Sequence, residues 1–364
     1  MTSMTLRIDS GLWCTGSLPD PPPLLAVLEV SGAVLSWTVD ADPAEPPVIA
    51  FTDPLRADWL WRVLGEAGHV AVVDALRYRD SGEPFDLTGV AVQTGSVAAA
   101  RRLAIGHWLR RWWPASARDG IAALDPAVLD AEIALLTVAA EDYFTDDTLD
   151  AEVAGLLQRH IPALNALAAQ GDPRVIAMVD DCRELAAEIG VTWVADMADV
   201  RRRDDYALAA GAGGSSSRDA IAGGVATVNW SAVPPGVFDA AEGTAEWSVV
   251  ATTGTVNVVV HVAVSGPNQA GGIGAQVRCG DHRGAGVLDD AGRAVLPVFG
   301  ADGQAPTETQ AWNVDWSSAD VRIGAAATES AETRDRVRAF ARARLAAPRD
   351  DAYLAEILAA ESDY

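Results

Sequence analysis

Three side chains in the N-terminal third of the sequence are candidates for catalysis. They are Asp53, Asp58 and His107. In an enzyme, carboxylates and a histidine converge in a concave pocket, where they shift one another's pKa and can transfer protons. The chemistry that these residues would support is hydrolysis, at a site between an N-terminal α/β unit and a helical bundle.

No short motif supplies a nucleophile or a metal for such a site. The sequence has neither a G-x-S-x-G nucleophile elbow nor a papain-like cysteine segment, although a triad built from distant residues stays open. The histidines are scattered, and none has a partner at zinc spacing. Cys279-Gly-Asp-His282 is the nearest approach to a ligand cluster, and a surface turn is its simpler interpretation. We therefore expect neither a metal nor a cofactor.

The basic charge of the chain comes entirely from arginine, because the sequence contains no lysine. A P-loop uses a lysine to reach the β- and γ-phosphates, and a protein kinase uses one on its third strand. A pyridoxal enzyme forms its Schiff base with a lysine. The sequence thus excludes these three chemistries, whether or not a GC-rich genome explains the bias toward arginine.

One predicted helix combines arginine with tryptophan, the two residue types most enriched in interface hot spots. It is a basic segment in a strongly acidic chain, which makes it a candidate for partner binding. The alternative is that the tryptophans pack inside a helical bundle and the arginines pair with neighbouring acidic helices. The candidate residues of this segment are Arg101, Arg102, Trp108, Arg110, Arg111, Trp112 and Trp113.

The charge and the cysteines narrow the class of partner and the compartment. A formal charge of −24 repels nucleic acid and anionic lipid, so we expect a protein partner and no nucleic-acid or membrane partner. No apolar run approaches the roughly 20 residues of a spanning helix, and no signal segment is evident at the start. Three widely separated cysteines suit a reducing compartment, which predicts a cytoplasmic protein.

The N-terminal part of the sequence alternates strand-like and helix-like patterns. At 364 residues the chain exceeds the usual size of one hydrophobic core, so several packed units are expected. Residues 1–95 predict a small α/β unit, with a helix that Asp53 caps and Pro54 begins. Its strands are expected at 24–30, 34–39, 69–78 and 89–95.

The remaining sequence predicts a helical part, a linker and a β-rich part. Residues 96–208 carry helical periodicity and predict a bundle packed on the α/β unit. The glycine- and serine-rich residues 209–224 predict an exposed linker, and residues 225–326 switch to the alternation of a β-sandwich. Residues 327–364 predict C-terminal helices. The expected fold class is therefore α+β and multidomain: an α/β unit with a helical bundle, then an antiparallel β-sandwich with C-terminal helices.

The C-terminal helices cannot be stable alone, because most helical stability comes from tertiary packing. They are expected to dock either on the body of the chain or on a partner. In the second case Tyr364, with Glu361 and Asp363, would reach a basic pocket of the partner.

Three segments resemble uncharacterised actinobacterial proteins. They are FTDPLRADWLWRVLGEAGHVAVVDALRY, WSAVPPGVFDAAEGTAEWSV and the ending LAEILAAESDY. The proteins that they resemble are accessory components that accompany MoxR-type AAA+ ATPases and von Willebrand A-domain proteins in bacterial conflict systems. The resemblance implies a non-catalytic adaptor beside such an ATPase, and it carries no functional residue with it.

The resulting hypothesis is an adaptor or regulatory protein that mediates protein–protein interaction, and the alternative is the hydrolase. An enzyme should show a pocket in which titratable groups converge. An adaptor should instead show an exposed patch that is apolar or patterned in charge.

Overall fold

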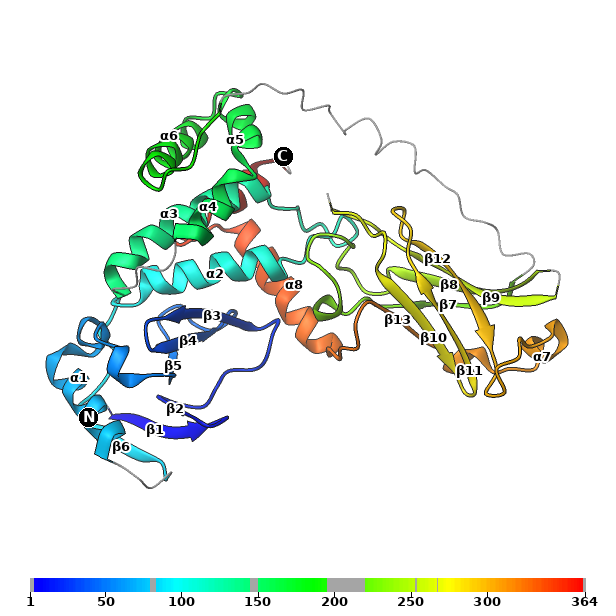
Figure 1. Cartoon of the computed structure of the whole chain (residues 1–364), viewed down its shortest axis with the longest axis horizontal. Helices are drawn as coiled ribbons and strands as arrows, with labels where there is room; N and C mark the ends of the chain where they lie inside the picture. The colour runs from blue at the N-terminus through cyan, green and yellow to red at the C-terminus, as the bar shows by residue number, and fades with distance from the viewer. Residues whose placement is uncertain are drawn as a thin grey trace. The chain divides into compact units, whose positions relative to one another are not determined.

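The computed structural model describes residues 3–78, 83–144, 150–194, 220–252, 254–266 and 268–362. The described residues form two compact units, and the second is inserted into the sequence of the first (Figure 1). The first unit draws on Met1–Trp112, Leu124–Met197 and Asp335–Tyr364, and the second on Trp113–Ala123 and Ala198–Arg334. The units differ from the predicted domains in two places. Residues 113–123, predicted in the helical bundle, belong to the β-rich unit, and residues 335–364, predicted as C-terminal helices, belong to the N-terminal unit.

The sheet of the first unit is antiparallel throughout its described strands. Their order is β3-β4-β5-β2-β1-β6. Gly32 closes the β3–β4 hairpin at φ 75°, where an added Cβ would lie 2.2 Å from the carbonyl oxygen of Asp53, so only glycine fits there. The strands are β1 (Ser3–Asp9), β2 (Leu12–Cys14), β3 (Leu25–Val30), β4 (Ala33–Thr38), β5 (Val48–Phe51) and β6 (Phe85–Thr88).

The strand prediction for 69–78 is wrong, because these residues continue helix α1 (Leu60–Tyr78). Burial of Leu64, Gly68 and Val72 follows a spacing of four, which is the period of a helix. Tertiary packing therefore overrides the strand preference of the valines. The prediction for 89–95 is also wrong, since the nearby strand β6 ends before it. Asp53 does act as a cap, for the short 3₁₀ helix η1 (Pro54–Arg56) that precedes α1.

The helical part follows the predicted pattern. Helix α2 lies against strand β3 and helix α3 (Figure 1). Asp125 caps α3, because its Oδ1 accepts hydrogen bonds from the backbone nitrogens of Ala127 and Val128. The helices are α2 (Ala98–Trp112), α3 (Pro126–Phe144), α4 (Asp150–Gln158), α5 (Ile161–Ala168) and α6 (Pro173–Glu188).

The C-terminal helices are α8 (Ala331–Ala346) and α9 (Leu354–Ser362). Helix α9 packs against α3. The backbone nitrogen of Leu354 donates to Glu132 over 2.7 Å, and the buried hydroxyl of Tyr353 donates to the carbonyl oxygen of Arg102 over 2.7 Å. Of the two expected docking modes, the structure shows docking on the body of the chain. Tyr364 lies outside the described residues.

The second unit is built on one curled antiparallel sheet, not on the two packed sheets of the predicted sandwich. The order of its described strands is β13-β10-β11-β12-β9-β8-β7. The edge strands β13 and β7 approach each other, so the sheet nearly closes into a barrel around a single core. The strands are β7 (Ala220–Ala226), β8 (Ala245–Thr252), β9 (Thr255–Val262), β10 (Gly274–Cys279), β11 (His282–Val287), β12 (Arg293–Phe299) and β13 (Asp320–Ile323).

A tight turn joins β11 and β12, and short helices complete the second unit. Gly292 adopts φ 74° in this turn, and Asp289 Oδ1 accepts from the backbone nitrogens of Ala291 and Arg293. Of the predicted linker, 209–219 lie outside the described residues and 220–224 form part of β7. The short helices are η3 (Trp230–Ala232), α7 (Glu308–Trp312) and η4 (Trp316–Ser318).

Two further features concern the membrane and the thiols. No helix among the described residues combines the length and the apolar character that crossing a bilayer requires. Cys14, Cys182 and Cys279 are buried free thiols.

Candidate functional site

The three candidate catalytic residues do not form a common site in the described part of the chain. Asp53 is exposed, and its side chain is committed to the backbone nitrogen of Leu55 at 3.1 Å. Asp58 is exposed beside the start of α1. His107 is half-buried on α2, and burial lowers the pKa of its imidazole from 6.5, while the charges that act on it are those of Glu152, Arg110 and Asp130. Neither Asp53 nor Asp58 is among them.

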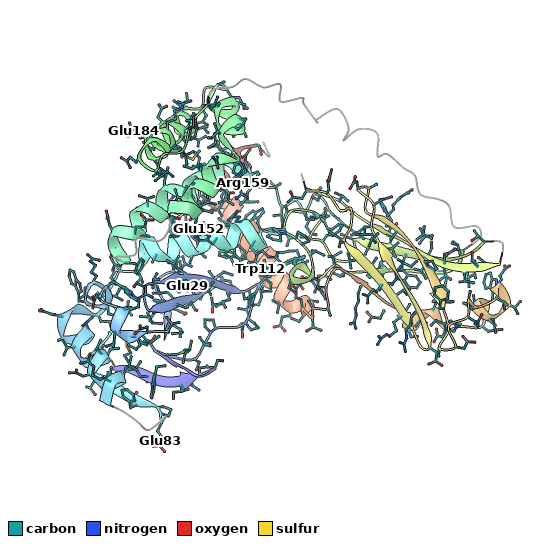
Figure 2. The ribbon with its side chains drawn as sticks, viewed as in Figure 1. Glu29, Glu83, Trp112, Glu152, Arg159 and Glu184 are labelled. Atoms are coloured by element: carbon teal, nitrogen blue, oxygen red, sulfur yellow. The ribbon has the colours of Figure 1, made fainter. Side chains whose placement is uncertain are left out.

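A cluster of charged side chains around the buried Asp130 lies next to His107 of α2. The sequence analysis did not predict this cluster. The carboxylate of Asp130 is 3% exposed and accepts from Arg159 Nη2 at 2.7 Å, and its Oδ2 lies 3.0 Å from His160 Nε2. Arg110 Nε lies 3.0 Å from the other carboxylate oxygen. Arg159 directly follows α4, which carries Glu152 (Figure 2). The guanidinium groups of Arg110 and Arg159 and the imidazole of His160 thus surround one buried carboxylate, and these contacts link α2, α3 and the α4–α5 connection.

The first two arginines of the tryptophan-rich helix are paired inside the first unit. Arg101 is buried, and its Nη1 lies 3.1 Å from Asp351 Oδ2. Arg102 forms an ion pair with Glu132, and its guanidinium lies 5.3 Å from the ring centroid of Tyr353. Burial raises the pKa of the Glu132 carboxyl group despite this pair. These contacts match the packing alternative for the helix.

The tryptophans of the same segment also make internal contacts. Trp108 is buried, donates to the carbonyl oxygen of Pro23 over 2.6 Å and meets the Phe340 ring edge-on at 5.4 Å. The guanidinium of Arg111 stacks on Trp112 at 4.1 Å. Trp113 belongs to the second unit, where its indole nitrogen donates to the carbonyl oxygen of Ala122 over 2.8 Å.

The Cys279–His282 segment is the turn of the β10–β11 hairpin. The two residues are paired in register, with Gly280 at φ 54° between them. The thiol of Cys279 donates to the carbonyl oxygen of Asp315 over 3.2 Å, and the His282 ring lies against Trp316 with centroids 6.0 Å apart. Within the described ranges no group of three or more histidine, cysteine or acidic side chains could hold a metal ion.

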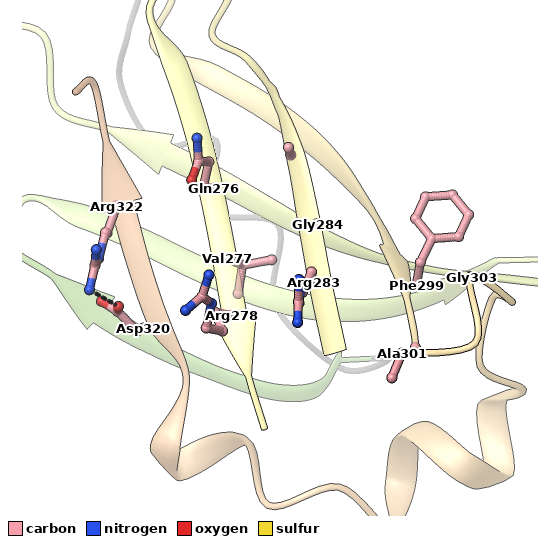
Figure 3. A pocket seen from close by; sticks show the side chains of 12 residues that line it. Gln276, Val277, Arg278, Arg283, Gly284, Phe299, Ala301, Gly303, Asp320 and Arg322 are labelled. Atoms are coloured by element: carbon pink, nitrogen blue, oxygen red, sulfur yellow. Dashed lines mark ion pairs between the residues drawn. The ribbon is translucent and has the colours of Figure 1, made fainter. Parts of the chain in front are cut away.

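An open groove of about 620 Å³ on the curled sheet is the candidate site, and we call it the arginine groove (Figure 3). Its volume lies in the range of roughly 300–1,000 Å³ that ligand sites occupy. Strands β10, β11, β12 and β13 and the loop after β12 form it. Its lining residues are Gln276, Val277, Arg278, Arg283, Gly284, Ala285, Phe299, Gly300, Ala301, Gly303, Asp320 and Arg322.

The alternation of the strands explains why arginines gather there. In β10, Val277 and Cys279 point into the barrel core, so Arg278 points outward. Arg278 is directly opposite Arg283 of β11 in the hairpin register. Neither guanidinium makes a hydrogen bond or an ion pair with any residue that the structure describes. Like charges in directly opposed positions destabilise a sheet.

The other walls of the arginine groove differ in charge and polarity. On the β13 side, Arg322 Nη2 lies 2.7 Å from Asp320 Oδ2, so this arginine is already paired. On the β12 side, Phe299 is opposite Arg283 in register and keeps 46% of its surface exposed. Figure 3 shows the sequence of groups across the strands: the Asp320–Arg322 pair, then Arg278 and Arg283, then Phe299.

The arrangement can bind an anionic group but has no evident means of catalysis. Guanidinium groups form charge-assisted, often bidentate hydrogen bonds with carboxylates. The lining residues include no histidine, cysteine, serine or threonine, and the single carboxylate, Asp320, is held by Arg322. The arginine groove thus offers guanidinium groups and an exposed aromatic side chain to a ligand.

Comparisons of the chain with protein-family models, with curated proteins and with solved structures give no match.

Proposed function

We propose that the chain is a non-catalytic adaptor that binds a partner protein through the arginine groove. The observation that carries this proposal is the pair Arg278–Arg283, two outward arginines in opposed positions and without a described partner. Their mutual repulsion disfavours the free sheet, and an anionic ligand between them would relieve it. Two arginines that repel each other in the empty groove do not stabilise the fold. Their placement is better explained by binding of an anionic ligand.

The charge of the whole chain favours a protein as the partner. A net charge of −24 creates a long-range field that opposes a phosphate backbone or an anionic bilayer. A protein segment carries its carboxylates locally and can approach the arginine groove with less repulsion. Exposed aromatic surface beside the arginines, as at Phe299, is also typical of protein interfaces.

The resemblance of the sequence to accessory proteins of conflict systems supports one partner class. We propose a MoxR-type AAA+ ATPase or a von Willebrand A-domain protein as the partner, in the bacterial cytoplasm. The free thiols of Cys14, Cys182 and Cys279 are compatible with that reducing compartment.

The test uses purified full-length proteins. The MoxR-type ATPase and the von Willebrand A-domain protein of the same genome would each be immobilised, and binding of the chain would be measured by biolayer interferometry. We expect binding that the double variant Arg278→Gln/Arg283→Gln loses. The matched control is Arg293→Gln, an exposed arginine at the opposite end of β12 on the same outward face. Binding that is equal in all three proteins, or absent for both candidates, would refute the proposal.

A further inference from the structure

We infer that the occupant of the arginine groove is an acidic, extended segment of the partner protein, in which two carboxylates at alternate positions are followed by an apolar side chain on the same face. This inference rests on the proposed function and gives its site a ligand chemistry. It follows from three properties of the groove: the spacing of its free arginines, the apolar wall beside them, and the carboxylate on its far side.

The spacing of the arginines fits side chains of one extended segment. Opposed residues in an antiparallel pair have Cβ atoms about 4.5–5.5 Å apart, so Arg278 and Arg283 present their guanidinium groups from neighbouring positions. In an extended segment, side chains two positions apart lie on one face and are separated by roughly 6.5–7 Å. Two acidic residues in alternate positions can therefore each reach one flexible guanidinium.

The apolar wall specifies what accompanies the carboxylates. Phe299 faces outward next to Arg283, and Val295, four positions back on the same strand and face, is 60% exposed. Burial of exposed aromatic and branched side chains against an apolar side chain of a ligand removes apolar surface from water and so stabilises the complex. A segment that carried charge alone would leave this surface in water.

The far wall discriminates against phosphate groups. Asp320 is opposite Arg278 in register. Because Asp320 forms an ion pair with Arg322, the guanidinium group of Arg322 is not available to bind a ligand. A phosphate carries nearly two negative charges at neutral pH, so repulsion from Asp320 and from the acidic chain penalises it more than a carboxylate. A phosphorylated segment is therefore disfavoured. A single-stranded oligonucleotide carries one negative charge on each phosphodiester and is disfavoured by the net charge of −24 of the chain.

The experiment measures fluorescence anisotropy of short labelled peptides with the full chain. The probe carries glutamate at two alternate positions and leucine two positions further along, so that all three side chains lie on one face of the extended peptide. One matched peptide has glutamine in place of glutamate, a second has alanine in place of leucine, and a third has phosphoserine in place of glutamate. We expect the probe to bind at least about tenfold more tightly than the glutamine peptide, because hydrogen bonds to charged groups are the stronger ones.

The chain variants locate the binding. Arg278→Gln/Arg283→Gln should weaken the probe about tenfold or more, Phe299→Ala should remove the preference for leucine over alanine, and Arg293→Gln should bind like the wild type. Circular dichroism and thermal unfolding of each variant show whether its fold is kept. Binding should also weaken as salt is added, because exposed charges are screened over about 8 Å at physiological ionic strength.

The contrary outcomes separate the inference from the proposed function. Equal binding of the glutamate and glutamine peptides, no binding of any peptide, or tighter binding of the phosphoserine peptide or an oligonucleotide overturns the inference. If the candidate partners still require Arg278 and Arg283, the proposed function survives that failure. If partner binding ignores both arginines while the peptide needs them, the ligand chemistry stands and the proposed function fails.

Discussion

Arg101 and Arg102 on helix α2 reach carboxylates of their own unit, whereas Arg278 and Arg283 on strands β10 and β11 reach none among the described residues. The first pair comes from a segment rich in tryptophan and arginine, and the second from strands without any such enrichment. The local composition of the sequence therefore predicted a binding site on helix α2, whereas the geometry of the structure favours one on the curled sheet.

The difference between the two regions lies in what surrounds each guanidinium. On α2, acidic residues from α3 and from the segment before α9 come within ion-pair distance, so the arginines form intramolecular ion pairs. On the curled sheet, Arg278 is opposite Arg283 and also opposite Asp320, whose carboxylate pairs with Arg322. Arg283 is opposite Phe299 of β12 on its other side. The pairing of a charged residue, and not its abundance in a segment, indicates whether it is available to a ligand.

The largest effect is expected where the arginines are most deeply paired. Arg344 and Glu356 form a buried ion pair, with Nη2 2.6 Å from Oε2, and both side chains are almost fully inaccessible. Glu356→Ala leaves the Arg344 charge buried, with Asp351 as its remaining acidic partner among the described residues, and should lower the free energy of unfolding by about 3–5 kcal/mol. Urea unfolding followed by circular dichroism measures this. Glu361→Ala on the same helix breaks an exposed pair with Arg174 and should change the free energy of unfolding far less.

Equal stability of the Glu356→Ala and Glu361→Ala variants would contradict this prediction. It would mean that the buried arginine pair contributes no more to the free energy of unfolding than the exposed pair.

The next effect concerns the close contact between α2 and the residue before α9. A Cβ at Gly106 would lie 2.2 Å from the hydroxyl oxygen of Tyr353 and 2.9 Å from Ile133 Cγ1. Gly106→Ala should therefore destabilise the protein by about 1–3 kcal/mol through overpacking. The matched control is Gly155→Ala on α4, where no atom lies within 4 Å of the added Cβ, and a gain of about 0.5–1 kcal/mol is expected there. Thermal unfolding in which both variants shift in the same direction would contradict the packing described for α9.

The pH dependence of stability tests the half-buried His107. Burial lowers the pKa of its imidazole below 6.5, so the folded protein binds a proton less readily than the unfolded chain. The stability from neutral His107 is therefore present above pH 6.5 and is lost as the pH falls below it, by at most about 1.4 kcal/mol per pH unit. In urea titrations between neutral and mildly acidic pH, His107→Gln should lose less stability than the wild type. Parallel curves would show that the imidazole is not held neutral.

The smallest effect is expected in the arginine groove itself. Arg278→Gln removes a like-charge contact and no described ion pair, so the free energy of unfolding should change by less than about 0.5 kcal/mol. Chemical denaturation of Arg278→Gln beside Arg102→Gln, which loses the pair with Glu132, measures the two regions directly. A large loss in Arg278→Gln would mean that the groove arginines serve the fold.

Much of the helical architecture was predictable because its signals are local. The helical periodicity of residues 96–208 predicted the helices that the structure shows as α2 and α3, and Asp125 before Pro126 is a local signal for the start of α3. The same reasoning failed at 69–78, where a run rich in valine has strand preference but is buried with helical period. Strands β1 and β2 were missed because they alternate over short, weakly apolar stretches.

The arginine groove was not predicted because strand register is a long-range property. One local signal could have led to it. Once Gly280 and Asp281 are taken as a two-residue hairpin loop, Cys279 pairs with His282 and the next opposed pair is Arg278 with Arg283. The approach of Asp320 and Phe299 to that pair depends on strands distant in sequence, and nothing local encodes it.

The insertion of the second unit into the sequence of the first has a consequence for biosynthesis. The first unit needs α9, whose residues leave the ribosome only after the whole of the curled sheet has been translated. Chain elongation proceeds at about 5–20 residues per second, and domains generally fold as units while they emerge. The inserted sheet can therefore finish folding while helices α2 and α3 still lack the partner that covers them. During that interval their apolar and charged surfaces are exposed to other nascent chains and to chaperones.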